Sequence, residues 1–518
     1  MGKITPSFKK AIFDEIVDNV TSNTSHYYAF AAGAEPWPGD TPLVQDTDYE
    51  LYFINDWQMH FGKRLLANNF AAIVKKYVWT ANTVYERYDN TQDMSNSMFY
   101  VIAPPSAIGG AYHVYKCIDN ANGAVSSKNP STIGTPTQST TFETTEDGYK
   151  WRYISSMSTE DFDRFSTVYY SPIFPNTTIQ ASSLTYSSIE TVVVSNAGVG
   201  YETYHNGTLQ GIVNTTALVI ESGASVNPGH YVNNSIYLYS SSNNAYQIFN
   251  ITGYNVTGAV RTVIIDAPAN TAALTAGASL YKISPKVVFT CDTASGNTPT
   301  AYTTVNSVTN SISSVVVLDK GSSITWANAV VVSNASYGSG ATVYPIVPPP
   351  GGHGSEPATE LGMQGVSISF TFANTESGTI SSNVIYNKIG LLKNPYALVA
   401  NTQSKGSRYS SNTFSQIQIA VCSPSYTFSN GDVIVGSNSH ARATVVWSNG
   451  TSVHYVGDKY FTDGESVLNG NNQVVTSIAI QNRGDIFVED LYPLYVQNIN
   501  NTERSNTQSE TFRLVIKL

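Results

Sequence analysis

Short runs of β-branched residues, interrupted by glycine and asparagine at near-regular intervals, fill the chain between about residues 187 and 345. The clearest runs are IETVVVSNAGVGY (189–201), RTVIIDA (261–267) and ISSVVVLDKG (312–321). Runs of this length, separated by turn-forming residues, are typical of strands joined by short connections. They predict a separate all-β module, either a sandwich or a stack of hairpins.

Strand-like segments also lie on both sides of this module. FYVIA (99–103) and YHVYKCI (112–118) are short, aromatic and β-branched, and TFRLVIKL (511–518) alternates apolar and polar residues. A string of short strands is expected between about 432 and 480, with Asn449-Gly450 as a hairpin turn. The proline and glycine residues of 345–362 indicate an ordered connector.

These patterns predict a mainly β fold, in which a multi-domain β-sandwich body carries a few peripheral helices and an inserted all-β domain. We expect an N-terminal β-rich region with peripheral helices over 1–185 and the inserted module over 186–345. The region 346–518 should return to the body and contain the small β module at about 432–480.

Three helices are predicted at the edges of this β framework. Apolar residues recur at every fourth position from Phe8 to Val20, after Thr5 and Pro6, which predicts an amphipathic helix over 5–22. A second helix is predicted from about Asn55, with Trp57, Phe61 and Leu65 on one stripe.

The third helix is expected at the segment TEDFDRF, because Ser158 and Asp161 form a weaker version of the capping box that begins many helices.

The charge content excludes several classes of function. Lys plus Arg number 27 and Asp plus Glu number 37, so the net charge is −10, and charged residues make up 12% of the chain. No cluster of Lys and Arg exists to neutralise phosphates, so we expect no direct nucleic-acid binding. No apolar stretch approaches the ~18 residues of a membrane span, so no membrane insertion is expected. Asp14, Glu15 and Asp18 occupy what would be the apolar part of a signal peptide, which predicts synthesis in the cytoplasm.

Glycine pairs give only a partial phosphate-binding pattern. Gly198 with Gly200, and Gly338 with Gly340, form G-x-G without a third glycine or a lysine. Each pair follows a β run, so we interpret these residues as turn glycines with positive φ.

Residues that could bind a metal are dispersed. Cys117, Cys291 and Cys422 lack zinc-site spacing and are interpreted as small buried hydrophobic residues. The sequence DTDYE (46–50) resembles the start of a calcium loop, but Leu51 stands where such a loop needs glycine. The histidines are also scattered, with no HExxH motif, at positions 26, 60, 113, 205, 230, 353, 440 and 454.

No catalytic arrangement emerges from the remaining residues. Glu35, Glu143, Glu146 and Asp147 lie in Pro- or Thr-rich loops, where no spacing singles out the acid and nucleophile of a glycoside hydrolase. There is no G-x-S-x-G elbow for a nucleophilic serine. The sequence therefore predicts no catalytic, cofactor-binding or metal-binding residues, and a protein that is not an enzyme.

Several segments, in their order along the chain, resemble the baseplate wedge subunits of contractile-tailed bacteriophages, and specifically the dimeric β-sandwich wedge protein of the myovirus baseplate. The resemblance covers roughly 1–185 and 346–518, whereas 187–345 and the module at 432–480 are additional. The segments that carry it are AEPWPGD (34–40), NDWQMHFGKRLL (55–66), VKKYVW (74–79), VYKCIDN (114–120), EDGYKWRYI (146–154), YNKIGLLKNPY (386–396) and the C-terminal stretch 483–518.

The resemblance implies a structural protein of the virion that forms a homodimer and joins other wedge subunits, with six wedges around a central hub. It implies assembly in the host bacterial cytoplasm and a final location in the tail baseplate, which changes shape when the tail meets the host. It supplies no catalytic residues, cofactor or metal.

Two other functions fit the composition. A receptor- or glycan-binding tail protein would explain the aromatic, Ser/Thr/Asn-rich character of 187–345. A depolymerase would also use a β-rich chain with many tyrosines and tryptophans, although no pair of carboxylates is singled out for it.

Overall fold

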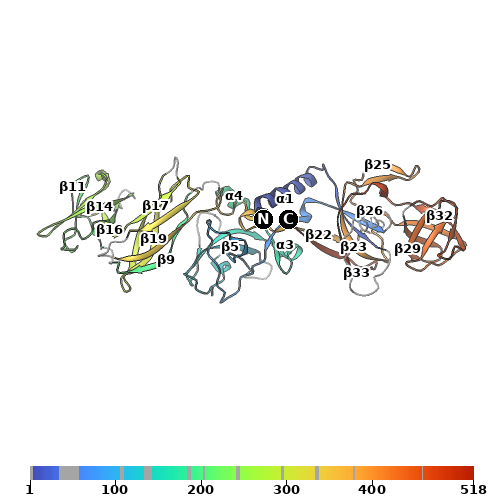
Figure 1. Ribbon diagram of the computed structural model, residues 1–518, viewed down its shortest axis with the longest axis horizontal. Coiled ribbons are helices and arrows are strands. Elements are labelled where there is room, and N and C mark those ends of the chain that lie inside the picture. Colours follow the sequence, from blue (N-terminus) through green and yellow to red (C-terminus); the bar gives the residue numbers. More distant parts are fainter. Residues whose placement is uncertain are drawn as a thin grey trace. The chain divides into compact units, whose positions relative to one another are not determined.

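A computed structural model describes residues 4–33, 58–105, 110–133, 143–183, 188–201, 205–240, 245–292, 297–332, 338–376, 380–457 and 459–518. The predicted mainly β, multi-domain fold is confirmed, because antiparallel sheets and a closed β-barrel account for most of the regular structure (Figure 1). The chain forms two compact units, one from 1–73 and 364–518 and the other from 74–363. None of the helices among the described residues is long and apolar enough to cross a bilayer.

The first unit begins with the predicted N-terminal helix, α1 (Pro6–Thr21). The side chain of Thr5 caps it by accepting a hydrogen bond from the Phe8 N–H at 3.3 Å, and Pro6 occupies the first turn, where no donor is needed. Helix α1 packs against β22 (Gly365–Phe372), whose other neighbours are β34 (Glu510–Lys517) and β3 (Phe70–Lys75) (Figure 1).

A five-stranded sheet forms the core of this unit. Its central strand β1 consists of the apolar sequence YYAFAA, and all six residues are buried. Strands β1 and β23 pair in register along their length, with Tyr28 opposite Leu392. The order is β26 (Thr413–Ser415), β2 (Met59–Leu65), β1 (Tyr27–Ala32), β23 (Val384–Lys393) and β33 (Pro493–Arg504).

The helix predicted from about Asn55 is wrong over its described part, because β2 is a strand paired with β1. The spacing of Phe61 and Leu65 is an even number of residues, so it places both side chains on one face of a strand as well as on one face of a helix. Pairing with the buried strand β1 makes this segment a strand and not a helix. Asn55 and Trp57 lie outside the described residues.

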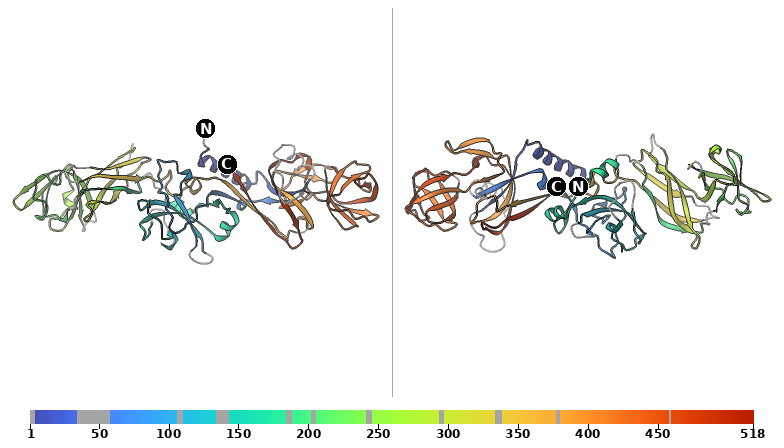
Figure 2. Two further views of the ribbon diagram at one scale, coloured as in Figure 1. Left: turned by 60° about the horizontal axis from the view of Figure 1, so that its bottom comes forward. Right: turned by 180° about the vertical axis from the view of Figure 1, so that it is seen from behind.

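A closed six-stranded barrel completes the first unit, together with a short hairpin of β24 (Tyr396–Val399) and β25 (Ser404–Arg408) (Figure 2). The turn predicted at Asn449-Gly450 is confirmed, with Gly450 at φ +90° and the Asn449 N–H donating to the Ser452 carbonyl at 3.1 Å. The predicted module at 432–480 lies within this barrel. Its strands are β27 (Gln418–Ser423), β28 (Val433–Gly436), β29 (Arg442–Ser448), β30 (Ser452–Gly457), β31 (Ser466–Leu468) and β32 (Val474–Asn482).

The second unit contains a sheet that we call the base sheet, ordered β4 (Tyr100–Ala103), β5 (Tyr112–Asn120), β7 (Tyr149–Met157) and β6 (Glu143–Thr144). One face of this sheet is an aromatic core, in which Trp151 stacks on Tyr149 with ring centroids 5.3 Å apart. The second unit also contains β8 (Tyr170–Pro172) and the short helices α3 (Thr159–Phe165), α4 (Thr177–Ser183) and α5 (Pro357–Glu360).

The remaining strands of this unit lie between residues 191 and 346, inside the range predicted for the all-β module. A four-stranded sheet is ordered β18 (Thr300–Asn306), β19 (Ser311–Asp319), β9 (Thr191–Val199) and β21 (Ser339–Ile346), beside the pair β17 (Val287–Cys291) and β20 (Ala327–Val331). A seven-stranded sheet is ordered β10 (His205–Thr208), β16 (Leu280–Pro285), β13 (Asn234–Ser240), β14 (Ala245–Thr257), β15 (Val260–Ile265), β12 (Ala217–Ile220) and β11 (Gly211–Asn214).

The predicted helix α3 is confirmed, and its cap allows a direct test. The exposed Ser158 accepts a hydrogen bond from the Asp161 N–H at 3.0 Å. Replacing Ser158 with alanine should lower the free energy of unfolding by about 1 kcal/mol. Ser158→Thr should retain most of the stabilisation that the cap provides, because threonine also has a hydroxyl that can accept the hydrogen bond. Urea unfolding of the two variants compares them, and equal stability would show that the cap contributes nothing.

Candidate functional site

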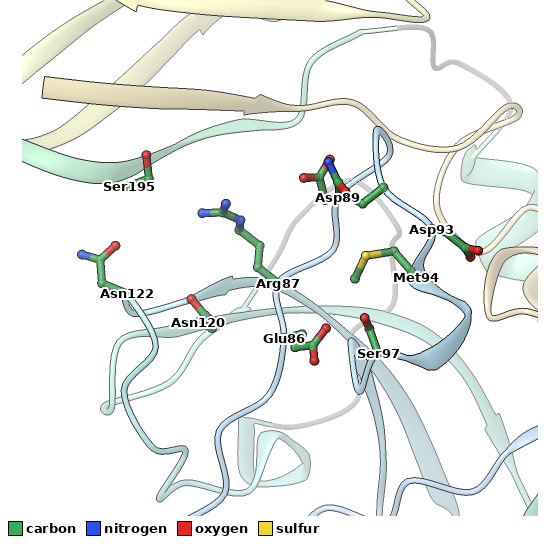
Figure 3. Close-up of a pocket in the computed structure, with 10 residues that line it drawn as sticks. Glu86, Arg87, Asp89, Asp93, Met94, Ser97, Asn120, Asn122 and Ser195 are labelled. Carbon is green, nitrogen blue, oxygen red and sulfur yellow. The ribbon is translucent and has the colours of Figure 1, made fainter.

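A polar pocket of about 510 Å³ opens in the second unit, where the base sheet region meets β9 (Figure 3). Arg87 lies in its middle, with Asn122 and Ser195 on one side and Met94 and Ser97 on the other. Asn120 and Asn122 come from the end of β5 and the turn after it, whereas Ser195 belongs to β9. The pocket therefore lies between segments that are far apart in sequence.

The contacts around Arg87 join these segments. Its guanidinium lies 4.3 Å from the centroid of the Tyr344 ring on β21, and the Tyr344 hydroxyl donates to Oδ2 of Asp89 at 3.0 Å. Asp89 also accepts hydrogen bonds from the backbone and hydroxyl of Thr91, at 2.9 and 2.7 Å. The wall of the pocket is thus a contact between the β9–β21 strand pair and the base sheet region.

The pocket is lined by three carboxylates and one guanidinium. Glu86, Asp89 and Asp93 place carboxylates around the single guanidinium of Arg87. The Ser195 hydroxyl is already within hydrogen-bonding distance of Thr342 Oγ1, at 2.8 Å. No histidine or lysine is among the residues that line this pocket.

Five ionisable side chains are buried where the base sheet meets the residues that flank β9 and β21. We call them the ion network: Lys116, Arg152, Glu190, His353 and Glu360. Lys116 on β5 and Arg152 on β7 lie directly opposite each other in the base sheet, on the face away from the aromatic core. Two like charges in this arrangement repel, so their burial requires neighbouring anions.

Two carboxylates supply that compensation, and a histidine lies between them. Lys116 Nζ lies 2.7 Å from Oε1 of Glu360 and 3.1 Å from Nδ1 of His353. His353 Nε2 lies 2.5 Å from Oε2 of Glu190, which forms an ion pair with Arg152. The other oxygen of Glu360 accepts a hydrogen bond from the Gly354 N–H at 2.6 Å. The five side chains therefore form one connected cluster.

Burial sets the charges of this cluster. It lowers the pKa of His353 to about 3, and the positive charge of Lys116 contributes in the same direction. Burial also lowers the pKa of Lys116 to about 8, although Glu360 partly offsets this effect. Burial would raise the pKa of Glu360, but Lys116 and His353 outweigh it and bring the pKa to about 2. At neutral pH Lys116 is therefore protonated, Glu360 is ionised and the imidazole of His353 is neutral.

The ion network connects three separate parts of the second unit. Lys116 and Arg152 belong to the base sheet, Glu190 immediately precedes β9, and His353 and Glu360 follow β21. The Tyr88 ring adds a further contact, with its centroid 3.2 Å from Lys116 Nζ. The network thus ties both ends of the segment between residues 190 and 353 to the base sheet.

The glycine pairs have the predicted positive φ at all four positions. Their assignment to turns is wrong for Gly198 and Gly340, which lie within strands β9 and β21. A Cβ on Gly198 would lie 2.6 Å from backbone atoms of β21, and a Cβ on Gly338 would lie 2.5 Å from the buried Tyr201 ring. These glycines allow β9 and β21 to approach each other closely.

The other residues considered from the sequence do not converge. Cys117 and Cys422 are buried as predicted, whereas Cys291 is only half-buried, and all three are free thiols. Glu146 forms an exposed ion pair with Lys128, and Asp147 accepts backbone hydrogen bonds from Ser127 and Lys128 in the same loop. Glu35 and the DTDYE segment (46–50) lie outside the described residues.

Among the described residues, no group of three His, Cys, Asp or Glu side chains is arranged to hold a metal ion. His353, Glu190 and Glu360 do meet, but the ammonium of Lys116 and the guanidinium of Arg152 balance their charges. In the sequence, His353 is only one of eight scattered histidines.

A signal for the ion network was present in the sequence. Lys116 interrupts the apolar strand sequence YHVYKCI, and Arg152 interrupts YKWRYI. A charged residue in the middle of a strand with apolar neighbours on both faces requires a buried partner. The partners Glu190, His353 and Glu360 could not be identified, because nothing in their spacing relates them to these strands.

No protein-family model matches the chain, and no curated protein matches it.

Proposed function

We propose that this chain is a structural subunit of a phage tail baseplate wedge, which forms a homodimer and bridges other wedge subunits during tail assembly and host attachment. In this role the chain holds several β modules in fixed positions and performs no reaction. It would be assembled in the cytoplasm of the host bacterium and reside in the baseplate of the virion.

The observation that carries this proposal is the position of the segments that resemble wedge subunits. VYKCIDN (114–120) and EDGYKWRYI (146–154) form the paired strands β5 and β7 and supply both cations of the ion network. YNKIGLLKNPY (386–396) forms most of β23, which pairs with the fully buried β1. These segments are therefore framework elements, as expected if the resemblance reflects a shared architecture.

The attachment of the module between residues 190 and 353 supports a mechanical role. Its first and last strands, β9 and β21, pair with each other, and the ion network ties the residues on either side of them to the base sheet. A mechanical force on the module would be carried by both β9 and β21 and by the ion network. Such an anchorage fits a subunit whose modules must keep their geometry while the baseplate changes shape.

Sedimentation velocity of the full chain tests the proposal. The protein alone should sediment with twice the mass of the 56.0 kDa chain. It should form a larger complex when mixed with the other wedge proteins of the same phage, and an unrelated capsid protein serves as the mixing control. A chain that remains monomeric at micromolar concentration and ignores the wedge proteins would contradict the proposal.

A further inference from the structure

A second pocket, of about 320 Å³, lies in the first unit beside the closed barrel. Trp447 on β29 and His454 on β30 line one part of it, and residues just before β23 and just after β33 line another. The volume is at the lower end of the ~300–1,000 Å³ typical of ligand sites. It therefore suits a small ligand.

The barrel provides an aromatic surface to this pocket. Trp447 and His454 are cross-strand partners, with ring centroids 4.7 Å apart and nearly perpendicular planes. The pairing of β29 with β30 is irregular between Val445 and Trp447, and such bulges re-aim the side chains beside them. Trp447 is only half-buried, so part of a rigid indole remains available to a ligand.

The facing part of the pocket is rich in neutral hydrogen-bonding groups. Amides come from Asn383 and Asn506, and hydroxyls come from Ser382 and neighbouring serines. The amide of Asn374 also lines the pocket but already bonds to Thr507 and Ser509. These groups can both donate and accept hydrogen bonds. They therefore match a ligand that carries many hydroxyl groups.

The charge of the pocket is also balanced. The buried Arg504 forms an ion pair with Glu510 and donates to the carbonyl oxygens of Phe372 and Ala373, at 3.1 and 2.9 Å. Burial lowers the pKa of His454, so its imidazole is neutral at neutral pH. A charged ligand would therefore find no unpaired opposite charge among the residues that line the pocket.

From the aromatic surface, the amides and hydroxyls and the balanced charge, we propose that this pocket binds a neutral saccharide of one or two rings. The Trp447 indole packs against the apolar face of a sugar ring, while the asparagine and serine side chains bind its hydroxyls. This places carbohydrate binding beside the barrel of the first unit and not in the module at 187–345. The site is independent of the proposed dimer.

Saturation-transfer NMR of the full-length protein tests the site, using glucose, galactose, mannose, N-acetylglucosamine, maltose, lactose and chitobiose as probes. At least one probe should bind with a dissociation constant on the order of 1 mM, as expected for a small ligand in a small pocket. Trp447→Ala should weaken that binding at least tenfold. Absence of a transfer signal from every probe, at concentrations on the order of 10 mM, would overturn the proposal.

Two further variants make the test specific. Trp326→Ala removes a tryptophan of the second unit that is 46% exposed, and it should leave saccharide binding unchanged. Ser382→Phe, at a half-buried position that lines the pocket, should fill the pocket and abolish binding even if Trp447→Ala folds poorly. Loss of binding in Trp326→Ala, or full binding in Ser382→Phe, would place the saccharide elsewhere and overturn the proposal.

Discussion

Replacing Glu360 with glutamine is expected to lower the free energy of unfolding of the second unit by about 3–5 kcal/mol, the usual cost of removing one partner from a buried ion pair. The side chains of Lys116 and Glu360 are 0% and 3% exposed, so solvent cannot replace the lost charge. Glutamine has a similar shape, but it leaves the ammonium of Lys116 facing the guanidinium of Arg152 with one anion fewer.

Denaturant unfolding followed by tryptophan fluorescence measures this effect, because Trp151 lies in the base sheet. The matched control is Glu146→Gln, which removes the carboxylate of the exposed Lys128–Glu146 pair. The control should leave the unfolding curve unchanged, since exposed ion pairs contribute little to stability. A loss below about 1 kcal/mol in Glu360→Gln would show that the network does not hold the unit together.

A double variant separates the charge from the packing. Replacing both Lys116 and Glu360 with methionine removes the two opposite charges together and retains much of the volume. Because a buried ion pair can often be replaced by apolar residues at little cost, the double variant should be more stable than Glu360→Gln alone. If the double variant is less stable than Glu360→Gln, the stability of this region depends on the packing of these side chains more than on the balance of their charges.

The stability of the second unit is expected to fall with pH below about 6.5 because of His353. Its pKa is lowered from 6.5 to about 3 in the folded protein. Between these values the unfolded chain binds a proton at this residue and the folded chain does not. Stability is therefore complete above pH 6.5 and decreases as the pH falls, by about 1.4 kcal/mol per pH unit for this one proton.

The charged side chains that surround His353 are Lys116, Arg152, Glu190 and Glu360. The pKa of Lys116 is lowered only to about 8 and that of Glu360 is held at about 2, so neither of these two groups titrates near pH 6. Unfolding free energies of the wild type and of His353→Gln should be compared between pH 6.5 and pH 5. Other histidines contribute equally to both proteins, so the difference in slope isolates His353. Identical slopes would show that folding does not lower the pKa of His353.

Local patterns were sufficient to predict much of the secondary structure. The helix after Thr5, the cap at Ser158 and the turn at Asn449-Gly450 each depend on residues within a few positions of one another. The local pattern does not identify strand β2, because the spacing of Phe61 and Leu65 fits both a helix and a strand. Only the neighbouring β1, more than 25 residues earlier, resolves that ambiguity.

The sites depend on contacts that no local pattern encodes. The charges of Lys116 and Arg152 inside apolar strands indicate that buried partners exist, but Glu190 and Glu360 are supplied by segments on either side of a long insertion. The pocket beside the barrel likewise combines Trp447 with Asn506, from different parts of the chain. Sequence could therefore suggest that such sites exist, but it could not assemble them.

The position of this protein in an intact phage tail tests the central proposal most directly, and a density map of isolated baseplates that resolves single domains is sufficient. We expect paired copies of the chain in each of six wedges around the hub, with the β barrel of the first unit recognisable in each copy. Density for the chain only at the tip of a tail fibre, or its absence from purified tails, would contradict the account.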